Sequence, residues 1–255
     1  MLRLLLTLAA FLGGCVTTAL SPAERGAIEK EVRETGTDRY LAVSFYVTPF
    51  FGDASKKLLT AVPPEEVLLL NQPTGAPVSP GKIEKILPVG TRVRILKIEF
   101  PTAWVLTERI PYTPRHLPWV YVQVLTEPPQ GALPYIFPVQ GETGSSSRIL
   151  TEVDRWISKS DPTAGMTTWP DQLRNAVRAK ETVPEMPAEA LAMALGYPDR
   201  IRVHFEGRVR WEDWYYPGGK RVALVADGKF MEFQSPPPAE QPAPPPAPAP
   251  APPQP

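Results

Sequence analysis

Side chains able to perform covalent or metal chemistry are few in this sequence and lie far apart. His116 and His204 are the two histidines, and Cys15 is the single cysteine. Two distant histidines do not form the closely spaced ligand set of a zinc site, and no Gly-x-Ser-x-Gly stretch marks a serine nucleophile. We therefore expect no catalytic residues, no metal ligands and no cofactor, and we predict that the protein is not an enzyme.

One group of carboxylates could supply a general acid and a general base. Glu206, Glu212 and Asp213 lie close together in the sequence, and paired carboxylates perform such chemistry in glycosidases. They alternate with Arg208 and Arg210 around a predicted hairpin, which is the pattern of a solvated strand face. We interpret the group as a surface of mutually compensating charges.

Cys15 has a different chemical role in our interpretation. An apolar run over residues 4–11 is followed by Leu12-Gly13-Gly14-Cys15, and this end of the chain resembles a signal peptide with the lipobox of bacterial lipoproteins. The resemblance implies cleavage after residue 14, a lipid on Cys15 and export to the cell envelope. Val16 in place of an aspartate favours the outer membrane, with the protein facing the periplasm. The alternative is an ordinary signal peptide with a chance cysteine.

The charge balance limits the partners that the chain can attract. The 27 basic and 27 acidic residues give a formal net charge of zero, so no overall field favours nucleic acid. We expect a membrane, contacted through the N-terminal lipid, and either envelope proteins or peptidoglycan as partners, with no nucleic acid and no small-molecule cofactor.

The region over residues 37–140 is predicted to be mainly β. Val93 and Ile95 share one strand face, after which the phase slips by one residue, so we predict a β-bulge or a sharp bend near Leu96. The stretch Leu-Pro-Val-Gly-Thr-Arg-Val-Arg-Ile at 87–95 resembles bacterial SH3-like domains. The resemblance implies a small barrel that binds peptides or cell-wall fragments through aromatic loops. The possible ligand groove would contain Trp104, Tyr112, Arg115, Trp119 and Tyr121; alternatively, these side chains pack the ends of the barrel.

After a predicted linker at 141–147, residues 148–234 have the pattern of three helices followed by three strands. Asp227-Gly228 is a strong hairpin signal. The segments at 186–198, 214–216 and 222–229 resemble the BamE/SmpA type of small lipoprotein domain: a Met-led helix ending in Leu-Gly-x-Pro, a Trp-x-Tyr strand and a closing strand. The resemblance implies helices packed on a three-stranded antiparallel meander.

The two ends of the mature chain are simpler. Residues 15–36 form the lipidated N-terminus with a short helix, which Ser21 and Glu24 begin as a capping box. Residues 235–255 are so rich in proline that we predict a disordered, extended tail. Alternatively, the tail functions as a spacer or as a ligand for an aromatic groove.

These predictions combine into an α+β protein in which an SH3-like β module precedes a BamE-like module. Its expected function is that of a lipid-anchored periplasmic binding or scaffold protein in outer-membrane protein assembly or envelope integrity. The alternative is a peptidoglycan-binding tether that joins the membrane to the cell wall through the SH3-like module.

Overall fold

The computed structural model describes residues 20–34, 38–67, 69–70, 77–128, 132–140, 144–217 and 220–234. The predicted signal peptide, Cys15 and the proline-rich tail therefore lie outside the described residues. Within the described residues, no helix is both long enough and apolar enough to cross a membrane.

The described residues form short helices and strands. The helices are α2 (Pro22–Glu34), η2 (Pro64–Glu66), α3 (Ala103–Glu108), α4 (Ser146–Trp156), η3 (Pro162–Thr168), α5 (Asp171–Ala179) and α6 (Ala188–Leu195). The strands are β1 (Arg39–Leu41), β2 (Phe45–Phe50), β3 (Asp53–Thr60), β4 (Leu69–Leu70), β5 (Pro77–Val78), β6 (Lys85–Leu87), β7 (Arg92–Glu99), β8 (Trp119–Val124), β9 (Tyr135–Pro138), β10 (Ile157–Ser158), β11 (Arg200–Glu206), β12 (Val209–Tyr215), β13 (Val222–Ala226) and β14 (Lys229–Gln234).

The first part of the fold is an eight-stranded mixed sheet that curves into a half-barrel. Its strand order is β10-β1-β7-β8-β9-β3-β2-β6, and every neighbouring pair is antiparallel except β3 and β9. Side chains alternate between the two faces of a strand. Val120, Val122 and Val124 therefore face the apolar cluster that α2 and α4 complete, whereas Trp119 faces a smaller cluster on the opposite side.

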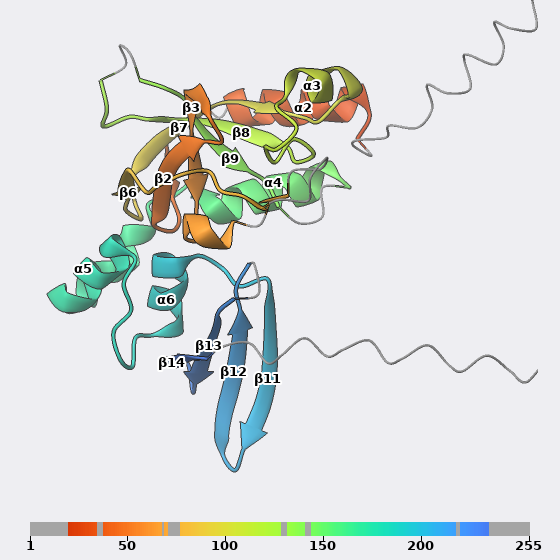
Figure 1. The fold of residues 1–255 in the computed structure, drawn as a ribbon. Helices are drawn as coiled ribbons and strands as arrows, with labels where there is room; N and C mark the ends of the chain where they lie inside the picture. Colours follow the sequence, from red (N-terminus) through yellow and green to blue (C-terminus); the bar gives the residue numbers. More distant parts are fainter. Residues whose placement is uncertain are drawn as a thin grey trace, which may run out of the picture.

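The second part is a four-stranded antiparallel meander, β11-β12-β13-β14, which α5 and α6 cover on one face. Its hairpins project away from the eight-stranded sheet (Figure 1). Asp227 and Gly228 turn the chain between β13 and β14 with φ angles of 47° and 78°. Positive φ at both central residues defines a type I′ turn, so the predicted Asp-Gly hairpin is confirmed.

The prediction of an SH3-like module followed by a BamE-like module is wrong. β1 pairs with β7 on one side and with β10 on the other, where Tyr40 lies opposite Ser158. β9 pairs with β3 in parallel, and the second sheet has a fourth strand in addition to the three predicted. The apolar face of α4, with Ile149 and Val153, packs in the core of the eight-stranded sheet. Sequence pattern locates strands, but it does not contain these long-range pairings.

Two local predictions are confirmed. The register between β7 and β8 shifts between Ile95 and Lys97, which places the bulge at the phase slip. The backbone N–H of Ser21 donates to the Glu24 carboxylate over 2.8 Å, and the Glu24 N–H donates to Ser21 Oγ over 3.3 Å. This reciprocal pair is the capping box that begins α2.

The eight-stranded sheet meets the helices of the second sheet at Ser44, which lies between β1 and β2, and at Lys180, which directly follows α5. Lys180 Nζ donates to the carbonyl oxygens of Ser44 at 2.6 Å and Ala194 at 2.7 Å. Ser44 Oγ donates to the Val177 carbonyl oxygen over 2.8 Å, and the Ser44 N–H donates to the Met193 carbonyl oxygen over 2.8 Å. These bonds fix the second sheet and its helices against one end of the first sheet.

Candidate binding groove

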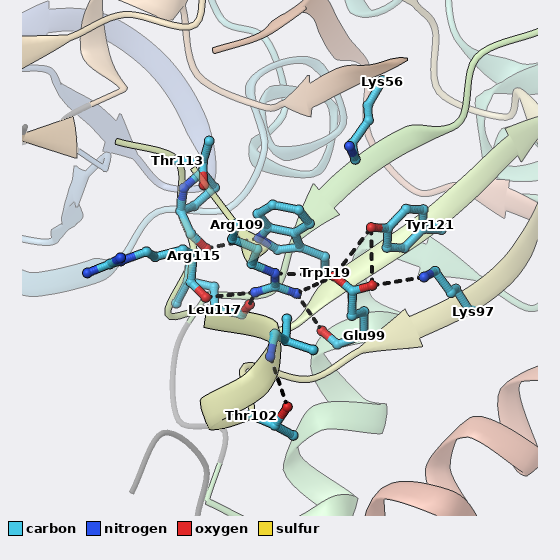
Figure 2. Close-up of polar contacts among 12 residues, drawn as sticks. Lys56, Lys97, Glu99, Thr102, Arg109, Thr113, Arg115, Leu117, Trp119 and Tyr121 are labelled. Atoms are coloured by element: carbon cyan, nitrogen blue, oxygen red, sulfur yellow. Dashed lines mark hydrogen bonds and ion pairs between the residues drawn. The ribbon is translucent and has the colours of Figure 1, made fainter. Parts of the chain in front are cut away.

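Trp119 and Tyr121, two of the predicted groove residues, lie on one face of β8 beneath the loop that contains α3. Trp119 is buried, and its indole Nε1 donates to the Pro114 carbonyl oxygen over 2.9 Å. The guanidinium carbon of Arg109 lies 3.7 Å from the centre of the Trp119 ring (Figure 2). This stacking attaches the loop to the sheet.

Arg109 has a structural role. Its Nη1 donates to the carbonyl oxygens of Arg115 at 2.7 Å and Leu117 at 2.8 Å. Its Nη2 donates to the Glu99 carbonyl oxygen and, together with Nε, to Glu99 Oε1 (Figure 2). A guanidinium has five N–H donors, and these five bonds use all of them. Arg109 therefore has no donor left for a ligand.

The Glu99 carboxylate is equally occupied. Burial raises the pKa of Glu99, but hydrogen bonds from Lys97 and Arg109 outweigh this effect and hold the pKa below its usual value. The Tyr121 hydroxyl lies 3.3 Å from Glu99 Oε1, and burial together with this carboxylate raises the pKa of Tyr121 far above its usual value. Glu99 thus stays ionised and Tyr121 stays protonated at neutral pH.

The other predicted groove residues are not in this buried cluster. Trp104 is 72% exposed on α3, and Tyr112 is 36% exposed on the following loop. The Arg115 side chain extends away from the cluster, with Nε 3.3 Å from His116 Nε2 (Figure 2). A cavity of about 160 Å³ contains Trp119 and Tyr121 in its lining but neither Trp104, Tyr112 nor Arg115. The five residues therefore do not line one common pocket.

A larger groove, of about 460 Å³, lies where the end of the eight-stranded sheet meets the connection into the second sheet. Its lining comes from β3 and the residues on either side of it (51–67), from β9 and α4, from the segment between α6 and β11, and from the loops at 114–117, 140 and 217. The apolar part of that lining includes Phe51, Leu58, Leu59, Phe137, Trp156 and Tyr197. This volume falls in the range typical of ligand-binding sites.

A continuous series of aromatic rings forms the floor of this groove. The ring centres of Phe137 and Trp156 are 5.7 Å apart, and those of Trp156 and Tyr197 are 5.2 Å apart with the planes at 79°. The guanidinium carbon of Arg155 lies 4.2 Å from the centre of the Tyr197 ring. Such ring pairs stabilise their mutual geometry beyond the effect of burial alone, so the floor is pre-formed.

Charged side chains form the polar part of the lining. Glu66, Glu152 and Asp199 contribute carboxylates, and Arg155 contributes a guanidinium. Burial raises the pKa of Asp199, and Arg155 partly opposes that shift. Glu66 also pairs with Arg221 at 2.8 Å. An apolar floor with a charged surround can hold an uncharged or basic ligand, with the apolar contacts providing most of the affinity.

The comparisons with known proteins give no further assignment. No protein-family model, no curated protein and no solved structure matches this chain. Among the described residues, no group of three or more His, Cys, Asp or Glu side chains could hold a metal ion. The resemblances to SH3-like domains and to BamE-type lipoproteins therefore find no support in these comparisons.

Sequence reasoning misses this groove because its lining residues are dispersed along the chain. Phe51, Leu58, Phe137, Trp156 and Tyr197 each have the local pattern of an ordinary core residue. A local signal exists at Gly196, which the sequence pattern marks as the end of a helix. In the structure Gly196 has φ 91° and ψ −176°, a conformation that essentially only glycine adopts.

Replacing Gly196 by alanine should destabilise the protein and disturb the groove floor. A Cβ atom there would lie 2.8 Å from Ala61 Cβ and 3.1 Å from Trp156 Cζ3. We expect Gly196→Ala to lower the free energy of unfolding by about 2–3 kcal/mol, as measured by urea titration. The matched control is Gly26→Ala in α2, where no atom lies within 4 Å. This control should raise the free energy of unfolding by up to about 1 kcal/mol. Equal effects of the two substitutions would contradict the conclusion that position 196 requires glycine.

Proposed function

We propose that this protein is a non-enzymatic binding protein of the bacterial cell envelope, anchored by a lipid on Cys15, that holds an extended segment of another envelope protein in the aromatic groove. The observation that carries the proposal is the groove itself, with its pre-formed floor of Phe137, Trp156 and Tyr197. The lipobox-like residues before Cys15 support the anchor.

The chemistry of the lining defines the ligand. Apolar rings recognise apolar or proline-containing segments, because these offer flat surfaces with few groups that require hydration. Glu66 is paired with Arg221 and Glu152 with Arg155, so Asp199 leaves the lining with a small negative charge that makes an acidic segment unfavourable. The groove therefore suits an uncharged or basic stretch of polypeptide. The backbone of this ligand would remain partly hydrated where it passes the charged residues of the lining.

The alternative of a peptidoglycan tether depended on an SH3-like module. The eight-stranded sheet is a different fold, and Trp104 and Tyr112 do not converge with Trp119 in one pocket. No structural observation among the described residues favours the tether over the protein-binding groove.

Site-specific photo-crosslinking in intact envelopes tests the groove. A photoreactive amino acid at Gln140 or Val67, both in the groove lining, should give a defined adduct with an envelope protein. The same amino acid at Ile83, which is 45% exposed outside this groove, is the matched control. Adding Tyr197→Ala should reduce the yield at Gln140 about tenfold, which corresponds to about 1.4 kcal/mol of binding. Equal adducts at Gln140 and Ile83 would contradict the proposal.

The lipid anchor is tested separately with Cys15→Ser. The parent protein should incorporate a fatty-acid analogue and sediment with membranes, because several acyl chains give lasting attachment. The variant should lose all label and move to the soluble fraction. A parent protein that carries no label and remains soluble would contradict the anchor without affecting the groove.

A further inference from the structure

The outer strand of the second sheet, β11, carries an uncovered row of apolar side chains. Ile201 and Val203 are each 46% exposed, and Phe205 is 68% exposed. β11 is an end strand in the order β11-β12-β13-β14, and in Figure 1 it lies at the outer side of the projecting hairpins. Long, flat apolar edges normally attract another strand.

This row continues the covered face of the sheet. Ile201 lies opposite Trp214 and Val203 lies opposite Glu212 in the register with β12. Trp214 is buried in the cluster that α6 completes, and cross-strand partners share a face. The apolar face therefore extends from Trp214 and Ile201, which line a hollow beside α6, to Val203 and Phe205, which are exposed.

The backbone of β11 also presents unpaired groups along this edge. Glu206 and Val209 close a two-residue turn in which Gly207 has φ 64°, and the closing pair of such a turn exchanges both hydrogen bonds. The alternation along an antiparallel ladder then directs the N–H and C=O of residues 200, 202, 204 and 206 toward β12. The N–H and C=O of Ile201, Val203 and Phe205 point outward.

We propose that β11 pairs antiparallel with β11 of a second copy of this chain, with Val203 opposite Val203 of that copy. In this register Ile201 lies opposite Phe205, and each of these pairs exchanges two backbone hydrogen bonds, about six in total. The two four-stranded sheets become one continuous sheet across the two copies. This surface is separate from the groove, so the inference does not rest on the proposed function.

The sequence of β11 is complementary to itself in this register. Arg200 of each copy lies opposite Glu206 of the other copy, so the symmetric pairing contains two such pairs. Opposite charges in directly facing positions stabilise a pair of strands, whereas like charges destabilise it. A slip of two residues that centres the pairing on Arg202 would place the two Arg202 side chains opposite each other. The register centred on Val203 avoids that repulsion and pairs all seven residues of the strand.

Exchanging the charges at positions 200 and 206 tests the pairing. The protein is the full mature chain with Cys15→Ser, and its association is measured by sedimentation velocity. Protein concentrations reach about 100 µM, because a small interface is expected to bind weakly. The chain should dimerise. Arg200→Glu alone and Glu206→Arg alone should each weaken dimerisation tenfold or more, because each places like charges opposite each other. The double variant should restore it. Thermal unfolding of dilute samples verifies that each variant is folded.

Cysteine crosslinking tests the register. Cys15 is the only cysteine in the chain, so Val203→Cys in the Cys15→Ser background introduces one thiol. Facing residues in a hydrogen-bonded pair have Cα atoms about 5.5 Å apart, which suits a disulfide. Val203→Cys should form a disulfide dimer in air. The matched control, Phe205→Cys on the same face, should not, because the thiols introduced in the two copies would lie four residues apart along the strands.

Three results would overturn the proposal. The first is a full chain that remains monomeric at all concentrations. If such a chain dimerises once residues 235–255 are removed, the proposal is also overturned, because the apolar row is then covered by the chain's own tail. The second is a dimer whose affinity neither single charge change alters. The third is equal disulfide formation by Val203→Cys and Phe205→Cys.

Discussion

The fold depends on one buried polar contact, in which the Lys180 amine joins the eight-stranded sheet to α6, a helix that covers the second sheet. Its Nζ lies 2.6 Å from the Ser44 carbonyl oxygen and 2.7 Å from that of Ala194. Burial, and secondarily the charge of Arg221, lowers the pKa of Lys180 well below its usual value. The centre of the Tyr46 ring lies 4.8 Å from Lys180 Nζ and favours the charged form, but burial has the larger effect on the pKa. The two carbonyl oxygens provide acceptors for two N–H groups of the Lys180 amine.

The position of the groove follows from this contact. Ser44 lies between β1 and β2 of the eight-stranded sheet, whereas Ala194 belongs to α6, which leads directly into Gly196 and Tyr197. The hydrogen bonds at Ser44 therefore place the Tyr197 ring beside Trp156, 5.2 Å between centres. Buried polar groups are costly when unpaired and specific when fully paired. The contact thus fixes one relative arrangement of the two sheets and, with it, the floor of the groove.

Local features of the fold could be predicted from the sequence, but its connectivity could not. The capping box at Ser21 and the bulge near Leu96 depend on neighbouring residues, and both are confirmed. The pairing of β1 with β10 joins Tyr40 to Ser158, and no local pattern encodes such a contact. The same limit applies to the groove, whose walls come from six separate parts of the chain. The residue type of Trp119 suggests a ligand groove, yet Arg109 covers its ring.

The pH dependence of stability for Lys180→Met is the most direct test of the joint between the sheets. Between the lowered pKa of the folded state and the unfolded value of 10.5, the unfolded chain binds more protons, so the free energy of unfolding rises with pH. Over the pH range between these two pKa values, the free energy of unfolding of the parent protein should rise relative to that of Lys180→Met by at most about 1.4 kcal/mol per pH unit. The exposed control Lys82→Met should keep the parent's slope. Parallel curves for the parent and Lys180→Met would contradict a buried Lys180 with a lowered pKa as the contact that joins the eight-stranded sheet to α6.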